Sequence, residues 1–236
     1  METIEKTICK KLTMDVTPRY HPYISYNRWF LYPFLIWIVA GGIAQLFFDR
    51  QILFAIVNTH HASWLDMLMV WITRMGEGVF GGVVLLLLLA LKGFRNWWYF
   101  FAAFLCNLLP SLLTQAIKSW VNAPRPLNYF KEAPWIHTAP EWERLMERSF
   151  PSGHTCAAFC LFTFLAMILV PRYKWLGLPL FLLALAVGYS RIYLAAHFFL
   201  DVYVGSLIGT FFTILVLRLM DKNPHYFFRR NKQTAS

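Results

Sequence analysis

Long apolar runs separated by short polar stretches dominate the pattern along this chain. The uncharged runs cover residues 29–48, 97–117, 155–170, 175–190 and 202–217. A helix of about 20 apolar residues crosses the hydrocarbon core of a bilayer, and the shorter runs reach this length if they extend into their polar flanks. A sixth run, residues 65–91, crosses only if Arg74 and Glu77 lie near its outer end. The pattern predicts six transmembrane helices.

The predicted fold is an all-α bundle of six transmembrane helices that forms a single domain over residues 1–236, with the motif-bearing core at about 97–220. The polar residues ahead of the first run predict a short N-terminal segment on the membrane surface, or a basic tail without structure. Residues 119–150 contain four prolines, which disfavour a continuous helix, and predict an ordered loop between the third and fourth helices. Within this loop, the charge spacing of residues 141–148 is compatible with a short helix.

Composition excludes an ordinary soluble domain. The chain is 58% hydrophobic and 14% charged, whereas soluble domains are about half apolar and a quarter charged. Three of the four cysteines, Cys106, Cys156 and Cys160, fall within predicted spans, so we expect no disulfide framework.

The basic residues predict the orientation of the bundle. Short cytoplasmic loops of membrane proteins are enriched in Lys and Arg. With six spans, most basic residues, among them Lys10, Lys11, Arg172 and Lys174, lie on the side of the two termini. We therefore expect an integral membrane protein of the kind found in a bacterial inner membrane, with both termini in the cytoplasm. Because topology accounts for the formal charge of +10, we expect no nucleic-acid binding.

The first candidate site segment lies where the third predicted helix ends. Lys118 is followed by Arg125, which stands between Pro124 and Pro126 and is held by their restricted backbone. Arg offers a planar fork to phosphate oxygens and Lys a compact charge. Taken alone, the two residues are better interpreted as ordinary anchors at the membrane interface.

The second segment, Pro151-Ser152-Gly153-His154, directly precedes an apolar run. Ser152 or Gly153 can therefore begin a helix, where free backbone N–H groups attract an anion. His154 in the first turn would face the same point. A structural histidine is the alternative.

The third segment joins the fifth predicted span to the sixth and contains Ser190-Arg191, His197 and Asp201. His197 and Asp201 are four residues apart, so on one helix they share a face and can form a hydrogen bond. Such a bond fixes the tautomer of the imidazole and leaves its other nitrogen as a nucleophile or base. A buried structural His–Asp pair is the alternative.

In order and spacing, these segments resemble the signature of the type 2 phosphatidic acid phosphatase superfamily. Its pattern is Lys, six residues, Arg-Pro; then Pro-Ser-Gly-His; then Ser-Arg, five residues, His, three residues, Asp, and this chain matches every position. The resemblance implies that His197 attacks phosphorus, that Asp201 orients it, and that His154 protonates the leaving oxygen. It also implies a phosphate site, without metal or other cofactor, formed by Lys118, Arg125, Ser152, Gly153 and Arg191.

A site at the membrane boundary implies a membrane lipid phosphate as the partner, processed at the extracytoplasmic face. Candidates are undecaprenyl diphosphate, phosphatidylglycerol phosphate, phosphatidate and lipid A, and the sequence does not indicate an oligomeric state. We expect selectivity to come from residues 119–150, His60, His61 and a lateral opening between helices. A lipid phosphotransferase with the same site and a soluble vanadate-dependent oxidase are the enzymatic alternatives, and a lipid transporter or binder is the non-enzymatic one.

Overall fold

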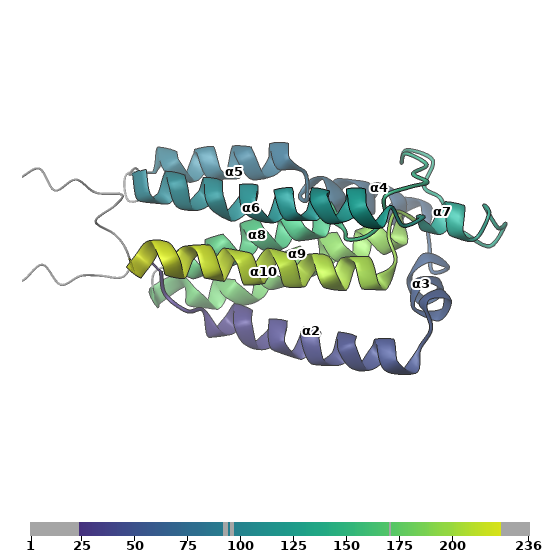
Figure 1. Ribbon diagram of the computed structural model, residues 1–236, viewed down its shortest axis with the longest axis horizontal. Coiled ribbons are helices and arrows are strands. Elements are labelled where there is room, and N and C mark those ends of the chain that lie inside the picture. The colour runs from purple at the N-terminus through teal and green to yellow at the C-terminus, as the bar shows by residue number, and fades with distance from the viewer. Residues whose placement is uncertain (1–23, 92–93, 95–96, 170, 223–236) are drawn as a thin grey trace, which may run out of the picture.

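The computed structural model describes residues 24–91, 94, 97–169 and 171–222, and every element in these ranges is helical (Figure 1). The predicted N-terminal surface segment falls on residues 1–23, outside the described residues. The elements, in chain order, are α2 (Arg28–Phe47), α3 (Arg50–Asn58), α4 (Ser63–Arg74), α5 (Gly78–Ala90), α6 (Trp97–Val121), α7 (Pro126–Tyr129), α8 (Gly153–Ile168), the 3₁₀ helix η2 (Pro171–Leu176), α9 (Gly177–Tyr193) and α10 (Phe199–Lys222).

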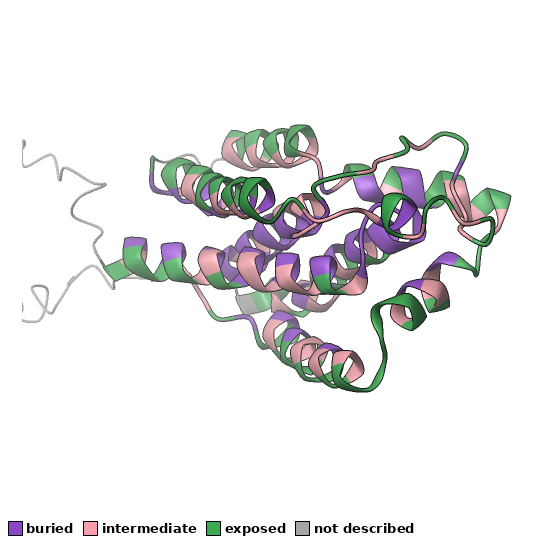
Figure 2. Cartoon of the chain, turned by 45° about the vertical axis from the view of Figure 1, so that its right-hand side comes forward, coloured by how far each residue is buried: buried purple, intermediate pink, exposed green. Residues whose placement is uncertain are grey.

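Helix α8 forms the centre of the bundle, and α6, α9 and α10 pack around it (Figures 1 and 2). Most of its side chains are buried, including Phe159, whose ring lies 5.8 Å from that of Phe34 on α2 and 6.3 Å from that of Phe181 on α9. By contrast, large apolar side chains such as Leu35 and Ile36 are exposed on the outside of the bundle, as expected for surfaces that face lipid.

Helices α8 and α10 approach each other through glycine. A Cβ atom on Gly209 would lie 2.5 Å from the carbonyl oxygen of Cys156, and one on Gly205 would lie 2.6 Å from that of Ser152. Small residues allow such backbone contact, and apolar helices in membranes associate through it. The Ser152 N–H also donates to the carbonyl oxygen of Asp201 at 2.9 Å, so the second and third motif segments are held together.

Within the described ranges, four helical segments are long and apolar enough to cross a membrane, and the bent pair α4–α5 counts as a fifth if it forms one span. These segments include α2, α6, α9 and α10, close to the predicted runs. Helix α8 has 16 residues, so it is about 24 Å long and shorter than the hydrocarbon core. The all-helical membrane fold is confirmed, whereas six complete spans and a single domain over residues 1–236 stay predictions.

The run at residues 65–91 is not one straight helix, and Arg74 and Glu77 lie at its bend. Their place near the outer end of a span stays a prediction. Helices α4 and α5 meet at 59° across this break. At this break the chain packs closely against α8: a Cβ atom on Gly76 would lie 2.7 Å from the carbonyl oxygen of His154. The bend brings Gly76 against the start of α8 and places Glu77 beside the candidate site.

Residues 130–152 form an irregular loop after the short helix α7, and the helix considered for residues 141–148 is absent from this described segment. The carbonyl oxygen of Met146 instead accepts the backbone N–H of Arg125 at 2.8 Å. Arg144 pairs with Glu132 at 2.7 Å rather than with a neighbour one turn away. Contacts outside the segment therefore outweigh its local helical spacing.

The two described ends of the chain lie together at one end of the bundle. Ile24 and Lys222 line a common pocket there, and α7 lies at the opposite end (Figure 1). Basic side chains gather at the end that holds the chain ends, where they line two neighbouring pockets: Arg28, Arg172, Lys174, Arg218 and Lys222.

Candidate active site

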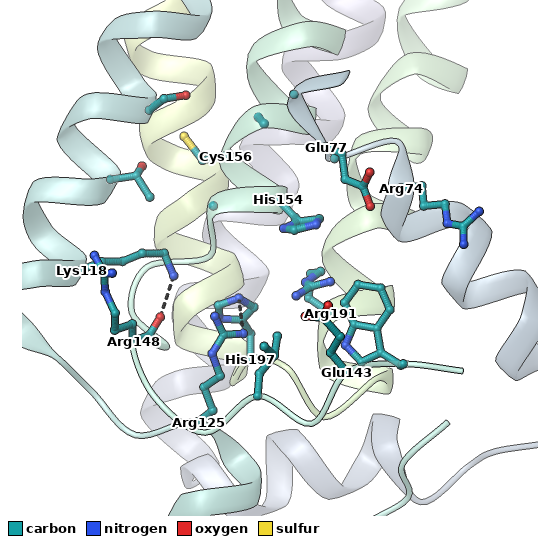
Figure 3. Close-up of a pocket in the computed structure, with 18 of the residues that line it drawn as sticks. Arg74, Glu77, Lys118, Arg125, Glu143, Arg148, His154, Cys156, Arg191 and His197 are labelled. Atoms are coloured by element: carbon teal, nitrogen blue, oxygen red, sulfur yellow. Dashed lines mark hydrogen bonds between the residues drawn. The ribbon is translucent and has the colours of Figure 1, made fainter. Parts of the chain in front are cut away.

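The three motif segments converge on one cavity of about 770 Å³ at the end of the bundle near α7. They come from the end of α6 with the turn before α7, from the first turn of α8, and from the end of α9 with the turn before α10. Figure 3 shows their labelled side chains around a common space. The predicted site residues that line the cavity are Lys118, Arg125, Gly153, His154, Arg191 and His197.

Main-chain carbonyl groups orient the two cations of the first segment. Lys118, which is 7% exposed, donates from Nζ to the carbonyl oxygen of Arg148 at 2.7 Å. Arg125 donates from Nε to the carbonyl oxygen of Glu147 at 2.7 Å and from a terminal nitrogen to that of Ala196 at 3.1 Å. Carbonyl oxygens fix these side chains without neutralising them, so both positive charges remain available to an anion.

Arg191 is buried on the far side of the cavity. Its guanidinium donates to Thr73 Oγ1 at 2.7 Å and lies over the ring of Trp142, with Cζ 4.9 Å from the ring centroid. The Nε atom is buried and has no hydrogen-bond partner among the described residues. A buried donor without a partner is costly. The side chain is therefore arranged to receive a further acceptor.

Helix α8 begins at the cavity as the sequence predicts. Ser152 is its N-cap: its hydroxyl accepts the N–H of Thr155 at 3.3 Å and is 2.8 Å from the Thr155 hydroxyl. Because Ser152 is fully buried in this role, Gly153 and His154 form the part of the turn that lines the cavity. A helix start with exposed N–H groups favours an anion.

His197 and Asp201 are close, although they do not lie on one helix as expected. Helix α10 begins at Phe199, so His197 belongs to the preceding turn, in which Ala195 has a φ of 51°. Asp201 causes this arrangement by capping its own helix: its Oδ2 accepts the N–H of Phe198 at 2.9 Å. His197 Nδ1 lies 3.4 Å from the same oxygen.

The remaining ring nitrogen of His197 lies beside the cations. Nε2 is 3.5 Å from a terminal nitrogen of Arg125. Burial, and then the charges of Arg191, Arg125 and Lys118, hold the pKa of His197 well below its usual range, and a hydrogen bond to the Ser149 backbone opposes this only in part. The imidazole is therefore neutral, with a lone pair available at Nε2 if the proton is on Nδ1.

The structure adds residues that the sequence pattern did not single out. Ser149 donates to Asp201 Oδ2 at 2.5 Å, and Trp142 lies against both Arg191 and His154, with the rings of Trp142 and His154 6.5 Å apart. A serine two positions before a motif and a tryptophan in an irregular loop carry no periodic signal. Only the folded loop reveals their contacts.

The two histidines expected to contribute to selectivity lie elsewhere. His60 is exposed, and its Nδ1 is 2.9 Å from the carbonyl oxygen of Ile56. His61 stacks on His137 with ring centroids 3.9 Å apart, and His137 pairs with Asp66 at 2.7 Å. These contacts anchor the loop, whereas the loop residues that line the cavity include Trp142 and Glu143. Selectivity through His60 and His61 therefore stays a prediction.

Comparison with known proteins identifies the family. The sequence model of the PAP2 superfamily matches residues 95–225, more than half of the chain. This chain belongs to the PAP2 superfamily. The type 2 phosphatidic acid phosphatase resemblance read from the motifs is confirmed, and so is the enzyme class, a lipid phosphatase of this superfamily.

Similar PAP2 proteins cover most of the chain. Phosphatidylglycerophosphatase B of Bacillus subtilis is 30% identical over 165 residues, which are 65% of this chain and 74% of that protein. An undecaprenyl-diphosphatase of Sulfolobus acidocaldarius is 26% identical over 187 residues, 79% of this chain and 85% of the relative. The crystal structure of LpxE from Aquifex aeolicus superposes with a TM-score of 0.58 at 30% identity, covering 73% of this chain and 97% of LpxE.

Proposed function

We propose that this PAP2 protein hydrolyses a lipid phosphate or diphosphate monoester through a phosphohistidine intermediate on His197. The observation that carries the proposal is the placement of the two ring nitrogens of His197. Nδ1 lies 3.4 Å from Asp201, while Nε2 lies 3.5 Å from Arg125 at the cavity. A carboxylate that holds the proton on Nδ1 leaves the Nε2 lone pair directed at an anion bound by the cations.

In the first step, Nε2 of His197 attacks phosphorus and forms a P–N bond while the bond from phosphorus to the leaving oxygen breaks. The negative charge of the bound phosphate favours the protonated form of His154, which lies on the opposite wall of the same cavity. His154 gives this proton to the leaving oxygen, so a neutral alcohol or a protonated phosphate departs. Asp201 stabilises the positive charge that develops on the imidazole.

In the second step, His154 takes a proton from a water molecule, and the resulting oxygen attacks the phosphoryl group. The P–N bond breaks, inorganic phosphate forms and His197 returns to its neutral state. Across both steps one water molecule is consumed and one phosphate is released, so no other reactant is needed.

The phosphoryl oxygens would be held by Lys118, Arg125 and Arg191, with the Gly153 N–H at the start of α8, the helix that Ser152 caps. The first three bring positive charge and are fixed by protein contacts before substrate arrives. Preorganised donors stabilise the charge that develops on these oxygens in the transition state.

A lipid substrate follows from where the cavity lies and from the relatives. It is at one end of a bundle whose outer surface is apolar, where the headgroup of a bilayer lipid can reach it. The basic residues at the opposite end, such as Arg172 and Lys174, support an extracytoplasmic active site and cytoplasmic termini in a bacterial inner membrane. The names of the relatives support phosphatidylglycerol phosphate and undecaprenyl diphosphate as the first candidates, before phosphatidate and lipid A.

The test is phosphate release by the purified protein from a panel of these four lipids in detergent micelles. The proposal expects release from at least one of them, and a drop of at least 1,000-fold, on the order of the loss seen when a nucleophile is removed, in a folded His197→Ala variant. Release by the variant at the rate of the unchanged protein would refute the nucleophile. Transfer of phosphate to a second lipid without free phosphate would instead indicate a phosphotransferase.

A further inference from the structure

Ser149 is a buried serine that contacts both members of the His–Asp pair. Ser149 is 1% exposed, and its hydroxyl donates to Asp201 Oδ2 at 2.5 Å. The same hydroxyl oxygen lies 3.5 Å from His197 Nδ1. The oxygen of Asp201 that faces the imidazole is thus fixed by two donors, the Ser149 hydroxyl and the N–H of Phe198.

The direct contact between His197 and Asp201 is long for a hydrogen bond. The two atoms are 3.4 Å apart, whereas N–H···O bonds in proteins usually measure about 2.7–3.2 Å. A carboxylate at this distance can select the tautomer and ring orientation only if it is itself held in place. Ser149 provides that restraint. The Ser149 oxygen itself is 3.5 Å from Nδ1, so the hydroxyl acts on the imidazole through the carboxylate.

The main chain of Ser149 is tied to the first motif segment. Its N–H donates to the carbonyl oxygen of Ala123 at 2.9 Å, and its own carbonyl oxygen accepts from Lys118 Nζ at 3.4 Å. The residue therefore links a cation of the phosphate site to the His–Asp pair, and these contacts limit how far its hydroxyl can move.

We propose that Ser149 is a positioning residue, which holds the Asp201 carboxylate against His197 and keeps the proton of the imidazole on Nδ1. The inference rests on the proposed role of His197 as the nucleophile. Without the Ser149 hydroxyl, only the Phe198 N–H holds this carboxylate oxygen. The imidazole then populates more of the other tautomer, whose Nε2 carries a proton and cannot attack phosphorus. We expect substrate binding to be unchanged, because the hydroxyl is directed at Asp201 and Ser149 is not among the residues that line the cavity.

The first experiment measures kcat and KM for Ser149→Ala. We expect kcat to fall about 10- to 100-fold, the usual effect of losing a hydrogen bond to a charged group, with KM within about twofold of that of the unchanged enzyme. Ser149→Thr keeps the hydroxyl and should recover most of kcat. Ser206→Ala is the matched control: it removes a buried hydroxyl from α10 that accepts Trp37 Nε1 at 2.9 Å, and should leave kcat unchanged.

The second experiment separates positioning from a merely structural role through a double-mutant cycle with Asp201→Asn. If Ser149 acts through the carboxylate, Ser149→Ala should lower kcat less than about twofold once Asp201 is replaced, because coupled residues are not additive. Losses that multiply, or an unchanged kcat in Ser149→Ala, would overturn the inference. If Ser149→Ala does not fold, Ser149→Cys, with its weak S–H donor, gives the same comparison.

His197→Ala is measured alongside these variants to keep the two proposals distinct. Full activity in His197→Ala means that the proposed function is wrong. An inactive His197→Ala together with a fully active Ser149→Ala means that the nucleophile stands and the role of Ser149 does not.

Discussion

The guanidinium of Arg191 lies against the indole of Trp142, with Cζ 4.9 Å from the ring centroid. An aromatic face stabilises a cation without neutralising it, and the ring also covers a charge that is otherwise buried. A terminal nitrogen of the guanidinium donates to Thr73 Oγ1, and Nε has no hydrogen-bond partner among the described residues. The loop that carries Trp142 therefore covers one of the cations of the proposed phosphate site.

Replacing Trp142 should reduce catalysis. We expect Trp142→Ala to lower kcat/KM about tenfold, since a desolvated cation–π contact contributes about 1–2 kcal/mol, and Trp142→Phe to keep most of the activity. Steady-state phosphate release measures the effect. The control is Trp64→Ala, which removes a side chain that is 71% exposed. Equal losses in Trp142→Ala and in the control would contradict a role at Arg191.

The glycine contact between α8 and α10 should be sensitive to one methyl group. Gly209→Ala places a Cβ atom 2.5 Å from the Cys156 carbonyl oxygen, so the helices must separate, and we expect a loss of about 1–3 kcal/mol in the free energy of unfolding. Gly82→Ala on α5 meets no atom within 4 Å and should be neutral or stabilising. Unfolding in detergent compares the two. Equal midpoints would show that α8 and α10 do not depend on this contact.

The neutral His197 should make stability depend on pH in a defined direction. In the unfolded chain the imidazole binds a proton below about pH 6.5, whereas burial and the neighbouring cations keep it neutral in the folded protein. The unfolded state thus binds more protons, and stability is full above pH 6.5 and falls as the pH drops. We expect His197→Gln to remove up to about 1.4 kcal/mol per pH unit of this slope between pH 6.5 and 5. Identical slopes in denaturant titrations of the two proteins would contradict a depressed pKa.

Activity should not require a divalent cation. Among the described residues, no group of three or more His, Cys, Asp or Glu side chains is arranged to hold a metal ion, and Lys118, Arg125 and Arg191 bring positive charge to the cavity. Phosphate release is therefore expected to continue in excess EDTA. A loss of activity that Mg²⁺ restores would mean that these cations are insufficient.

Much of the architecture could be predicted from the sequence, because a helix that crosses the hydrocarbon core of a bilayer must be about 20 residues long and mostly apolar. The runs at residues 29–48 and 202–217 correspond closely to α2 and α10. The motif residues were located by fixed spacings around helix ends, and six of them line one cavity, including Lys118, His154 and His197. Helix periodicity and capping are local properties, so a sequence reveals them.

The remaining features depend on contacts between distant segments. At the bend, Gly76 packs against the backbone of His154, and the irregular course of residues 141–148 includes contacts such as Arg144 with Glu132. The turn that holds His197 outside α10 depends on how Asp201 caps its own helix. Hydropathy and spacing carry no information on these contacts.

The central claim is a covalent intermediate on His197, and trapping it is the most direct measurement. A lipid substrate labelled in its terminal phosphoryl group would be mixed with the enzyme, quenched in alkali within milliseconds and analysed by mass spectrometry, since phosphohistidine survives base and is hydrolysed in acid. The account predicts label on His197 that forms and decays at rates consistent with turnover and is absent from His197→Ala. Turnover without labelled His197, or with label on another residue, would contradict it.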